Sequence, residues 1–229
     1  MSLNPPVPDP ESDPNSFGTV AFYAALGKAF VAMCGVVVGL FLIEVLNHAD
    51  GNRLNALGGI HPHSLDGIDG IVFAPFLHAS FAHFYSNAVP LLLTGTFALA
   101  IGVKRFLGVT VLIALVSGLG VWFIGSPNTR VVGASGVILG YIGFLLVRGI
   151  VERSWWGIAV GLLIGLLYGT QIFGDITPTN EQVSWQAHLF GLIGGVIAAI
   201  LFRRRRPRPV TPREPEPLVN PTLDLPSLD

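Results

Sequence analysis

The sequence predicts an all-α polytopic membrane protein, built as a bundle of six transmembrane helices. The first observation is the composition, since 51% of the residues are hydrophobic and only 12% are charged. The mean hydropathy of +0.64 is typical of a chain whose solvent is mostly lipid. The second observation is that apolar stretches long enough to cross a ~30 Å hydrocarbon core recur along the chain.

Six such stretches divide the chain, and glycines, prolines and basic residues separate them. The flanking tails are rich in proline and acidic residues and cannot bury enough apolar area to fold. We therefore expect a helical domain over 25–204, with a disordered cytoplasmic N-terminus over 1–24 and a disordered Pro-rich cytoplasmic tail over 205–229. The first stretch should act as an uncleaved signal anchor. The predicted helices span about 29–47, 81–102, 106–125, 133–149, 155–173 and 185–202.

The basic residues predict the orientation of the helices. Eleven of the thirteen Lys and Arg residues fall on the side of both termini, and only Arg53 and Arg130 fall on the other side. Positive residues are retained in the cytoplasm, so both termini are expected there. The second, fourth and sixth helices then all begin at the outer face.

Polar side chains are concentrated where those three helices begin. Ser135 lies in Gly133-Ala134-Ser135-Gly136, and His188 begins the last helix. At ~1.5 Å per residue both lie about 20 Å above the cytoplasmic arginines, so their depths match. His78, His83 and Asn87 begin the second helix, and His83 and Asn87 share one face. Polar groups from three helices at one depth indicate a wet cavity.

These residue types suit hydrolysis of a carbonyl compound. Ser135 can serve as the nucleophile and His188 as its base, and nearby donors can hold the oxyanion. The first turn of a helix also leaves backbone N–H groups unpaired beside Ser135. Gly136, Gly191 and other glycines on the fourth and sixth helices allow the close helix packing that a Ser–His hydrogen bond requires.

In these motifs and their order the chain resembles the rhomboid intramembrane serine proteases. The resemblance covers the second to sixth helices and implies a catalytic dyad of Ser135 and His188 with no acidic member. It implies oxyanion stabilisation by His83, Asn87 and the backbone N–H of Ser135. It also implies supporting roles for His78, Gly133 and Gly136 around the site.

The resemblance further implies a substrate and a route to the site. The partners are the transmembrane segments of single-pass membrane proteins within the lipid bilayer, cut near the outer face, and no nucleic acid. Substrate is expected to enter past the fifth helix, with residues 174–184 as a lid. The thirty residues 48–77, too long for a passive turn, are expected to form a partly inserted outer loop.

The chain departs from the family at two positions that bear on the site. Leu139 stands where many rhomboids carry a tyrosine that stacks on the catalytic imidazole, and Tyr141 falls on a different helix face. The Trp-Arg pair common in the first outer loop is missing. The sequence therefore does not predict what orients the His188 imidazole.

Two other functions fit part of the sequence. A metal-dependent membrane hydrolase could use His78, His83 and His188 as zinc ligands, although it leaves Gly-Ala-Ser-Gly unexplained. A non-catalytic protein could bind transmembrane helices and guide their fate. The favoured protease needs neither cofactor nor metal. The short six-helix form without an organellar presequence favours a bacterial plasma membrane.

Residues outside the motifs carry weaker expectations. Glu44, near the outer end of the first helix, is expected to organise the long loop by accepting backbone hydrogen bonds. Trp155, Trp156 and Trp185 are expected to be interfacial anchors.

Overall fold

The computed structural model describes residues 13–14, 16–175 and 184–204, with the side chains of 169–175 left aside. All regular elements in these ranges are helical, apart from one isolated antiparallel bridge between Ile60 and Val131. Five of the eight α-helices correspond closely to predicted segments: α4 (Phe81–Leu99), α5 (Val103–Ile124), α6 (Ser135–Val151), α7 (Trp155–Asp175) and α8 (Trp185–Leu201).

Helix α1 (Val20–Ala49) is longer than its predicted segment. It begins nine residues before position 29 and inside the 1–24 range assigned to a tail. Lys28 lies inside the helix, because a lysine is a good helix former and its long side chain can reach the interface. Thr19 caps the helix instead, because its hydroxyl accepts the Phe22 N–H at 3.1 Å.

By length and composition, two described helices are suited to crossing a membrane, α1 and α5. Helix α6, helix α8 and the Trp155–Tyr168 part of α7 are shorter apolar helices. The all-helical class is therefore observed in the described residues. The predicted tail over 205–229 and most of the predicted 174–184 lid lie outside the described residues.

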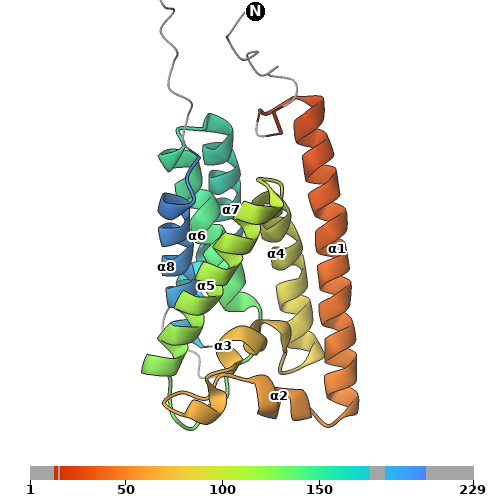
Figure 1. Ribbon diagram of the computed structural model, residues 1–229, viewed down its shortest axis with the longest axis vertical. Helices are drawn as coiled ribbons and strands as arrows, with labels where there is room; N and C mark the ends of the chain where they lie inside the picture. The colour runs from red at the N-terminus through yellow and green to blue at the C-terminus, as the bar shows by residue number, and fades with distance from the viewer. Residues whose placement is uncertain (1–12, 15, 176–183, 205–229) are drawn as a thin grey trace, which may run out of the picture.

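Helix α6 occupies the centre of the bundle (Figure 1). It packs against α4, α5, α7 and α8, whereas α1 stands at one flank and packs mainly on α4. Helices α4, α6 and α8 run in the same direction and begin at the end of the bundle that carries α2 and α3 (Figure 1). The three polar clusters of the sequence therefore start at one end of the molecule.

The long connection between α1 and α4 is folded into short helices at that end. It comprises α2 (Arg53–Gly58), the 3-10 turns η2 (Leu65–Gly67) and η3 (Ala74–Phe76), and α3 (Gly70–Phe73). Ile60 and Val131 exchange two backbone hydrogen bonds of 2.9 Å, which tie this connection to the segment before Ser135. Trp122 at the end of α5 also donates to the Ser64 carbonyl at 2.9 Å. The connection is thus part of the folded core around the helix starts.

Candidate active site

Ser135 and His188 meet across the interface between α6 and α8. Ser135 is the first residue of α6, and His188 lies in the first turn of α8. The His188 Nε2 atom lies 2.6 Å from the Ser135 Oγ, which is hydrogen-bond distance. His188 is only 5% exposed, and Ser135 is half-buried. A hydroxyl and an imidazole in this geometry can exchange a proton.

Close packing of α6 on α8 makes this contact possible. A Cβ at Gly191 would overlap the carbonyl oxygen of Gly136, and a Cβ at Gly195 would overlap that of Gly140. Gly191 lies one turn after His188, and Gly136 directly follows Ser135. The glycines therefore let two backbones approach at the level of the Ser–His pair.

Helix α5 holds the start of α8 through Ser117. Its hydroxyl donates to the Ala187 carbonyl at 2.8 Å, next to His188 in the chain. A Cβ at Gly136 would meet both this hydroxyl and, at 3.0 Å, the same carbonyl oxygen. Sequence reasoning missed Ser117, although a lone serine inside an apolar segment is the type of signal that could have found it.

His83 lies against the backbone just before Ser135. A Cβ at Gly133 would lie 2.7 Å from its Cε1 and 2.9 Å from its Nε2, and Gly133 has a φ of 130° that favours glycine. The Ala79 N–H donates to His83 Nδ1 at 3.5 Å. A ring that accepts on Nδ1 when neutral carries its hydrogen on Nε2, the nitrogen nearest Gly133. His83 can therefore donate a hydrogen bond at the Ser135 end of the site.

Asn87 is buried one turn further along α4. One N–H of its side-chain amide donates to the His83 carbonyl at 2.8 Å. Asn87 thus supports the backbone of the turn that carries His83, and its second N–H is the one that could serve an oxyanion. The structure brings His83, Gly133, Ser135 and His188 together, and Asn87 lies one turn after His83 on α4, hydrogen-bonded to its backbone.

His78 is buried beneath this group, at 1% exposure. Its ring lies edge-on to His83, with centroids 5.3 Å apart, and edge-on to Phe84 at 5.5 Å. Burial, together with the nearby His83, lowers the pKa of His78 to about 4. His78 is therefore a neutral packing residue under the His83 ring at ordinary pH.

Two asparagines hold the backbone of His78 in place. The Asn55 Nδ2 donates to the His78 carbonyl at 2.8 Å and the Asn47 Nδ2 does so at 3.5 Å, while the Asn47 Oδ1 accepts the Leu54 N–H at 3.1 Å. Asn47 is fully buried near the end of α1. Sequence reasoning did not select Asn47, although an amide inside an apolar helix is a recognisable signal.

The structure shows where Leu139, Tyr141 and Glu44 lie relative to the Ser–His pair and the outer loop. Leu139 is buried in the core, and the Tyr141 hydroxyl lies 2.7 Å from Thr110 Oγ1 while its ring stacks on Phe106. Tyr141 therefore faces α5 rather than the Ser–His pair. Glu44 is 1% exposed, and no loop N–H group of the described residues donates to its carboxylate, so it does not accept the hydrogen bonds expected of it.

The histidines considered for zinc do not gather as ligands. Within the described ranges no three His, Cys, Asp or Glu side chains form a group suited to holding a metal ion. His83 and His78 are neighbours, whereas the His188 Nε2 is directed at Ser135. The geometry around Ser135 is that of a nucleophile, a base and nearby donors.

Comparisons with known proteins indicate the same family as the sequence motifs. A family model described as "Rhomboid domain" matches residues 68–205. An uncharacterized protein of Mycobacterium tuberculosis (strain H37Rv) is 40% identical over 170 residues, covering 71% of this chain and 70% of the relative. An uncharacterized protein of Mycobacterium leprae is 36% identical over 170 residues, covering 71% and 67%. A Bacillus subtilis protein named "Putative rhomboid protease YdcA" is 29% identical over 140 residues, covering 58% and 66%.

Proposed function

Since this chain belongs to the rhomboid family, we propose that it is an intramembrane serine endopeptidase with a dyad of Ser135 and His188. The observation that carries the proposal is the 2.6 Å approach of His188 Nε2 to Ser135 Oγ across the glycine-lined α6–α8 interface. Two polar side chains in apolar helices are costly unless they serve each other or a ligand. Proton transfer from serine to histidine gives that pairing a purpose.

Acylation would begin when the Ser135 Oγ attacks a substrate carbonyl. His188 takes the hydroxyl proton on Nε2 and then returns it to the leaving amine. The carbonyl oxygen becomes an oxyanion, which the Ser135 N–H and the Nε2–H of His83 would stabilise, with Asn87 as a further donor. Deacylation repeats the steps with a water molecule activated by His188.

The location of the site near helix starts bears on the substrate class. We propose that all six long helices, α1 and α4–α8, cross the bilayer and that both termini are cytoplasmic. The basic residues support this, because all but two lie on the side of the termini. A transmembrane substrate would then be cut near the outer face, most readily where Gly or Pro weakens its helix and exposes a carbonyl. A plasma membrane is the proposed location.

Cleavage of a model transmembrane substrate in liposomes tests the proposal. Wild type is expected to cut, and Ser135→Ala and His188→Ala to lose about a thousandfold or more in rate, as serine hydrolases do when the dyad is broken. A fluorophosphonate probe should label wild type and not Ser135→Ala. A chelator should leave the rate unchanged, since metal ligands play no part.

The same experiment separates the proposal from its alternatives. Loss of activity with chelator would favour the metal-dependent hydrolase. Absence of both labelling and cleavage in a folded wild-type protein, with retained binding of transmembrane peptides, would favour the non-catalytic binder. No observation in the described structure favours either of these over the dyad.

A further inference from the structure

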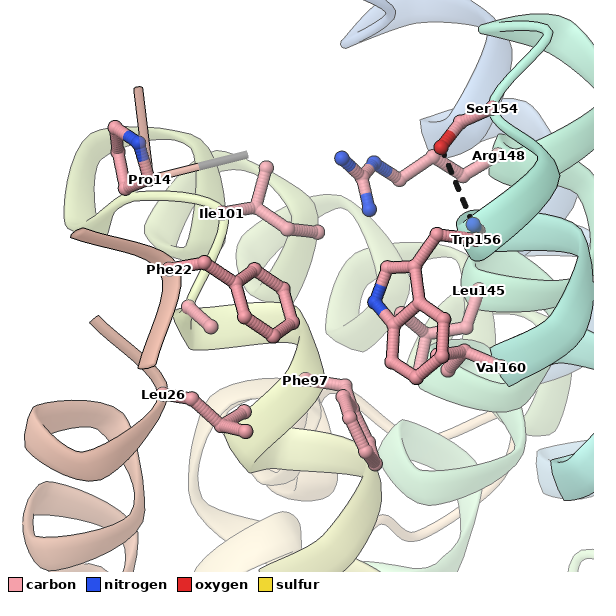
Figure 2. Close-up of a pocket in the computed structure, with 12 residues that line it drawn as sticks. Pro14, Phe22, Leu26, Phe97, Ile101, Leu145, Arg148, Ser154, Trp156 and Val160 are labelled. Atoms are coloured by element: carbon pink, nitrogen blue, oxygen red, sulfur yellow. Dashed lines mark hydrogen bonds between the residues drawn. The ribbon is translucent and has the colours of Figure 1, made fainter. Parts of the chain in front are cut away.

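A cavity lies at the end of the bundle opposite the Ser–His pair, between the start of α1, the end of α4, the end of α6 and the start of α7 (Figure 2). It is a small hollow that opens to the outside. It shares no residue with the candidate active site. The residues that line it and enter the argument are Phe22, Leu26, Phe97, Arg148, Ser154 and Trp156.

The inner walls of the cavity are apolar and aromatic. Figure 2 shows the Trp156 ring at the centre of the view, with Phe22 and Phe97 on the facing helices. The Trp156 ring stacks on Phe17 at 3.9 Å and lies edge-on to Phe22 at 6.0 Å. Leu26 completes the α1 wall. Walls of this kind suit a hydrocarbon chain rather than a polar ligand.

A guanidinium group lies at one side of this apolar space. Figure 2 shows the Arg148 side chain leaving α6 and extending beside the cavity. Its Nε lies 2.9 Å from the Glu152 carboxylate. No residue in the described ranges accepts a hydrogen bond from its two terminal nitrogens, which are the ones available to a ligand. The neighbouring Ser154 hydroxyl accepts the Gly157 N–H at 3.2 Å, so its own hydrogen can also be donated.

Among the described residues paired around Arg148, positive charges outnumber negative ones, with Arg105, Arg148 and Arg204 against Glu152 and Asp13. Glu152 pairs with both Arg148 and Arg105, and it also accepts the Arg204 backbone N–H at 2.9 Å. The Arg204 side chain pairs with Asp13 at 3.0 Å. Within the described residues, two guanidinium groups thus share the Glu152 carboxylate. Of these two, Arg148 lines the cavity, where a ligand with one negative charge would give it a second partner.

We propose that this cavity binds an anionic phospholipid, with its phosphate on Arg148 and Ser154 and one acyl chain along Phe97 and Trp156. The occupant is chosen by the combination of an apolar channel and a surplus cation at its rim. Basic pockets between transmembrane helices on the cytoplasmic side are suited to acidic lipid headgroups. The proposal depends on this end of the bundle lying in a leaflet and not on proteolysis.

Fluorescence quenching by brominated lipids tests the proposal on the full chain in micelles. Bromine on an acyl chain quenches a tryptophan that it touches, and the difference between wild type and Trp156→Phe isolates the Trp156 signal. Brominated phosphatidylglycerol is expected to bind about fivefold more tightly than brominated phosphatidylcholine, the preference that one arginine near the surface supplies. Equal quenching by the two lipids would overturn the proposal.

Two further measurements test the role of Arg148 and the identity of the ligand. Arg148→Gln should bring the preference for phosphatidylglycerol close to onefold, while Arg130→Gln, a matched change at the opposite end, should keep it. If Arg148→Gln does not fold, the comparison of the two lipids on wild type still decides. Displacement of the brominated lipid by glycerol phosphate at similar concentration would overturn the lipid assignment in favour of a free phosphate ligand.

Discussion

The substitution Gly191→Ala should abolish most activity without touching either member of the proposed dyad. The added Cβ would overlap the Gly136 carbonyl oxygen, well inside the 3.0 Å that real Cβ atoms keep. The three atoms of Gly136 that the Cβ would meet all belong to the helix backbone, so no flexible side chain can move aside. The two helices must separate by on the order of 1 Å at this level to relieve the overlap.

That separation acts directly on the proposed proton transfer. The Ser135 Oγ and His188 Nε2 atoms are 2.6 Å apart, and Gly191 and Gly136 are within one turn of them. An added ~1 Å takes the pair beyond a useful hydrogen bond. A misplacement of this size costs about a hundredfold in rate. The free energy of unfolding should fall too, by about 1–3 kcal/mol, as it does for overpacked interfaces.

The assay is cleavage of a transmembrane substrate in liposomes, alongside thermal unfolding of each variant. Gly39→Ala is the matched control, because a Cβ at Gly39 in α1 meets nothing within 4 Å. Gly194→Ala, on the same helix as Gly191 but facing α5, meets Val116 at 3.1 Å and should be milder. A folded Gly191→Ala protein that cuts at the wild-type rate would refute the link between this packing and the chemistry.

Three other predictions concern groups around the site. The lowered pKa of His78 means that its unfolded form binds a proton first, so stability should fall as the pH drops from 6.5 toward 4, by about 3 kcal/mol at most. Thermal unfolding against pH checks this, and His78→Asn should flatten the slope; an unchanged slope rejects it. Asn47→Ala should lower the free energy of unfolding by about 1–3 kcal/mol and also lower the cleavage rate. It leaves the Leu54 N–H unpaired and removes a hydrogen bond to the His78 carbonyl. An unaltered melting temperature would contradict this. Glu44→Gln should raise the free energy of unfolding by on the order of 1 kcal/mol in denaturant titrations, since burying a neutral amide costs less than burying a carboxylate. A loss of stability would instead reveal a bound cation or a donor to the charge.

Much of the helical organisation could be predicted from hydropathy, because apolar length is the strongest signal a membrane sequence carries. The starts of α4, α7 and α8 agree with the predicted segments at Phe81, Trp155 and Trp185. The start of α1 could not be found in this way, because its first turns are interrupted by Lys28, and charge is a poor guide to where a helix begins. The cap at Thr19 is the local signal that decides it.

The chemically distinctive residues of the candidate site could be predicted from the sequence. The hydrogen bonds that hold these residues in position could not. Ser135, His188 and His83 are polar residues at the starts of three apolar segments. Their positions therefore predict a shared cavity. The hydrogen bond from Ser117 to the Ala187 carbonyl joins residues 70 positions apart, and nothing in the local sequence of either predicts it. The buried pairing of Tyr141 with Thr110 likewise depends on how α5 rotates against α6.

Helix α1 lies at the flank of the bundle, outside the interface between α6 and α8 that holds the Ser–His pair. This helix packs mainly on α4, and the family match begins only at residue 68. Three of its glycines, Gly27, Gly35 and Gly39, face open space. If α1 crosses the bilayer as proposed, these three positions should tolerate other small or apolar residues. Asn47 should not tolerate substitution in this way, because its amide holds the His78 carbonyl and the Leu54 N–H of the loop.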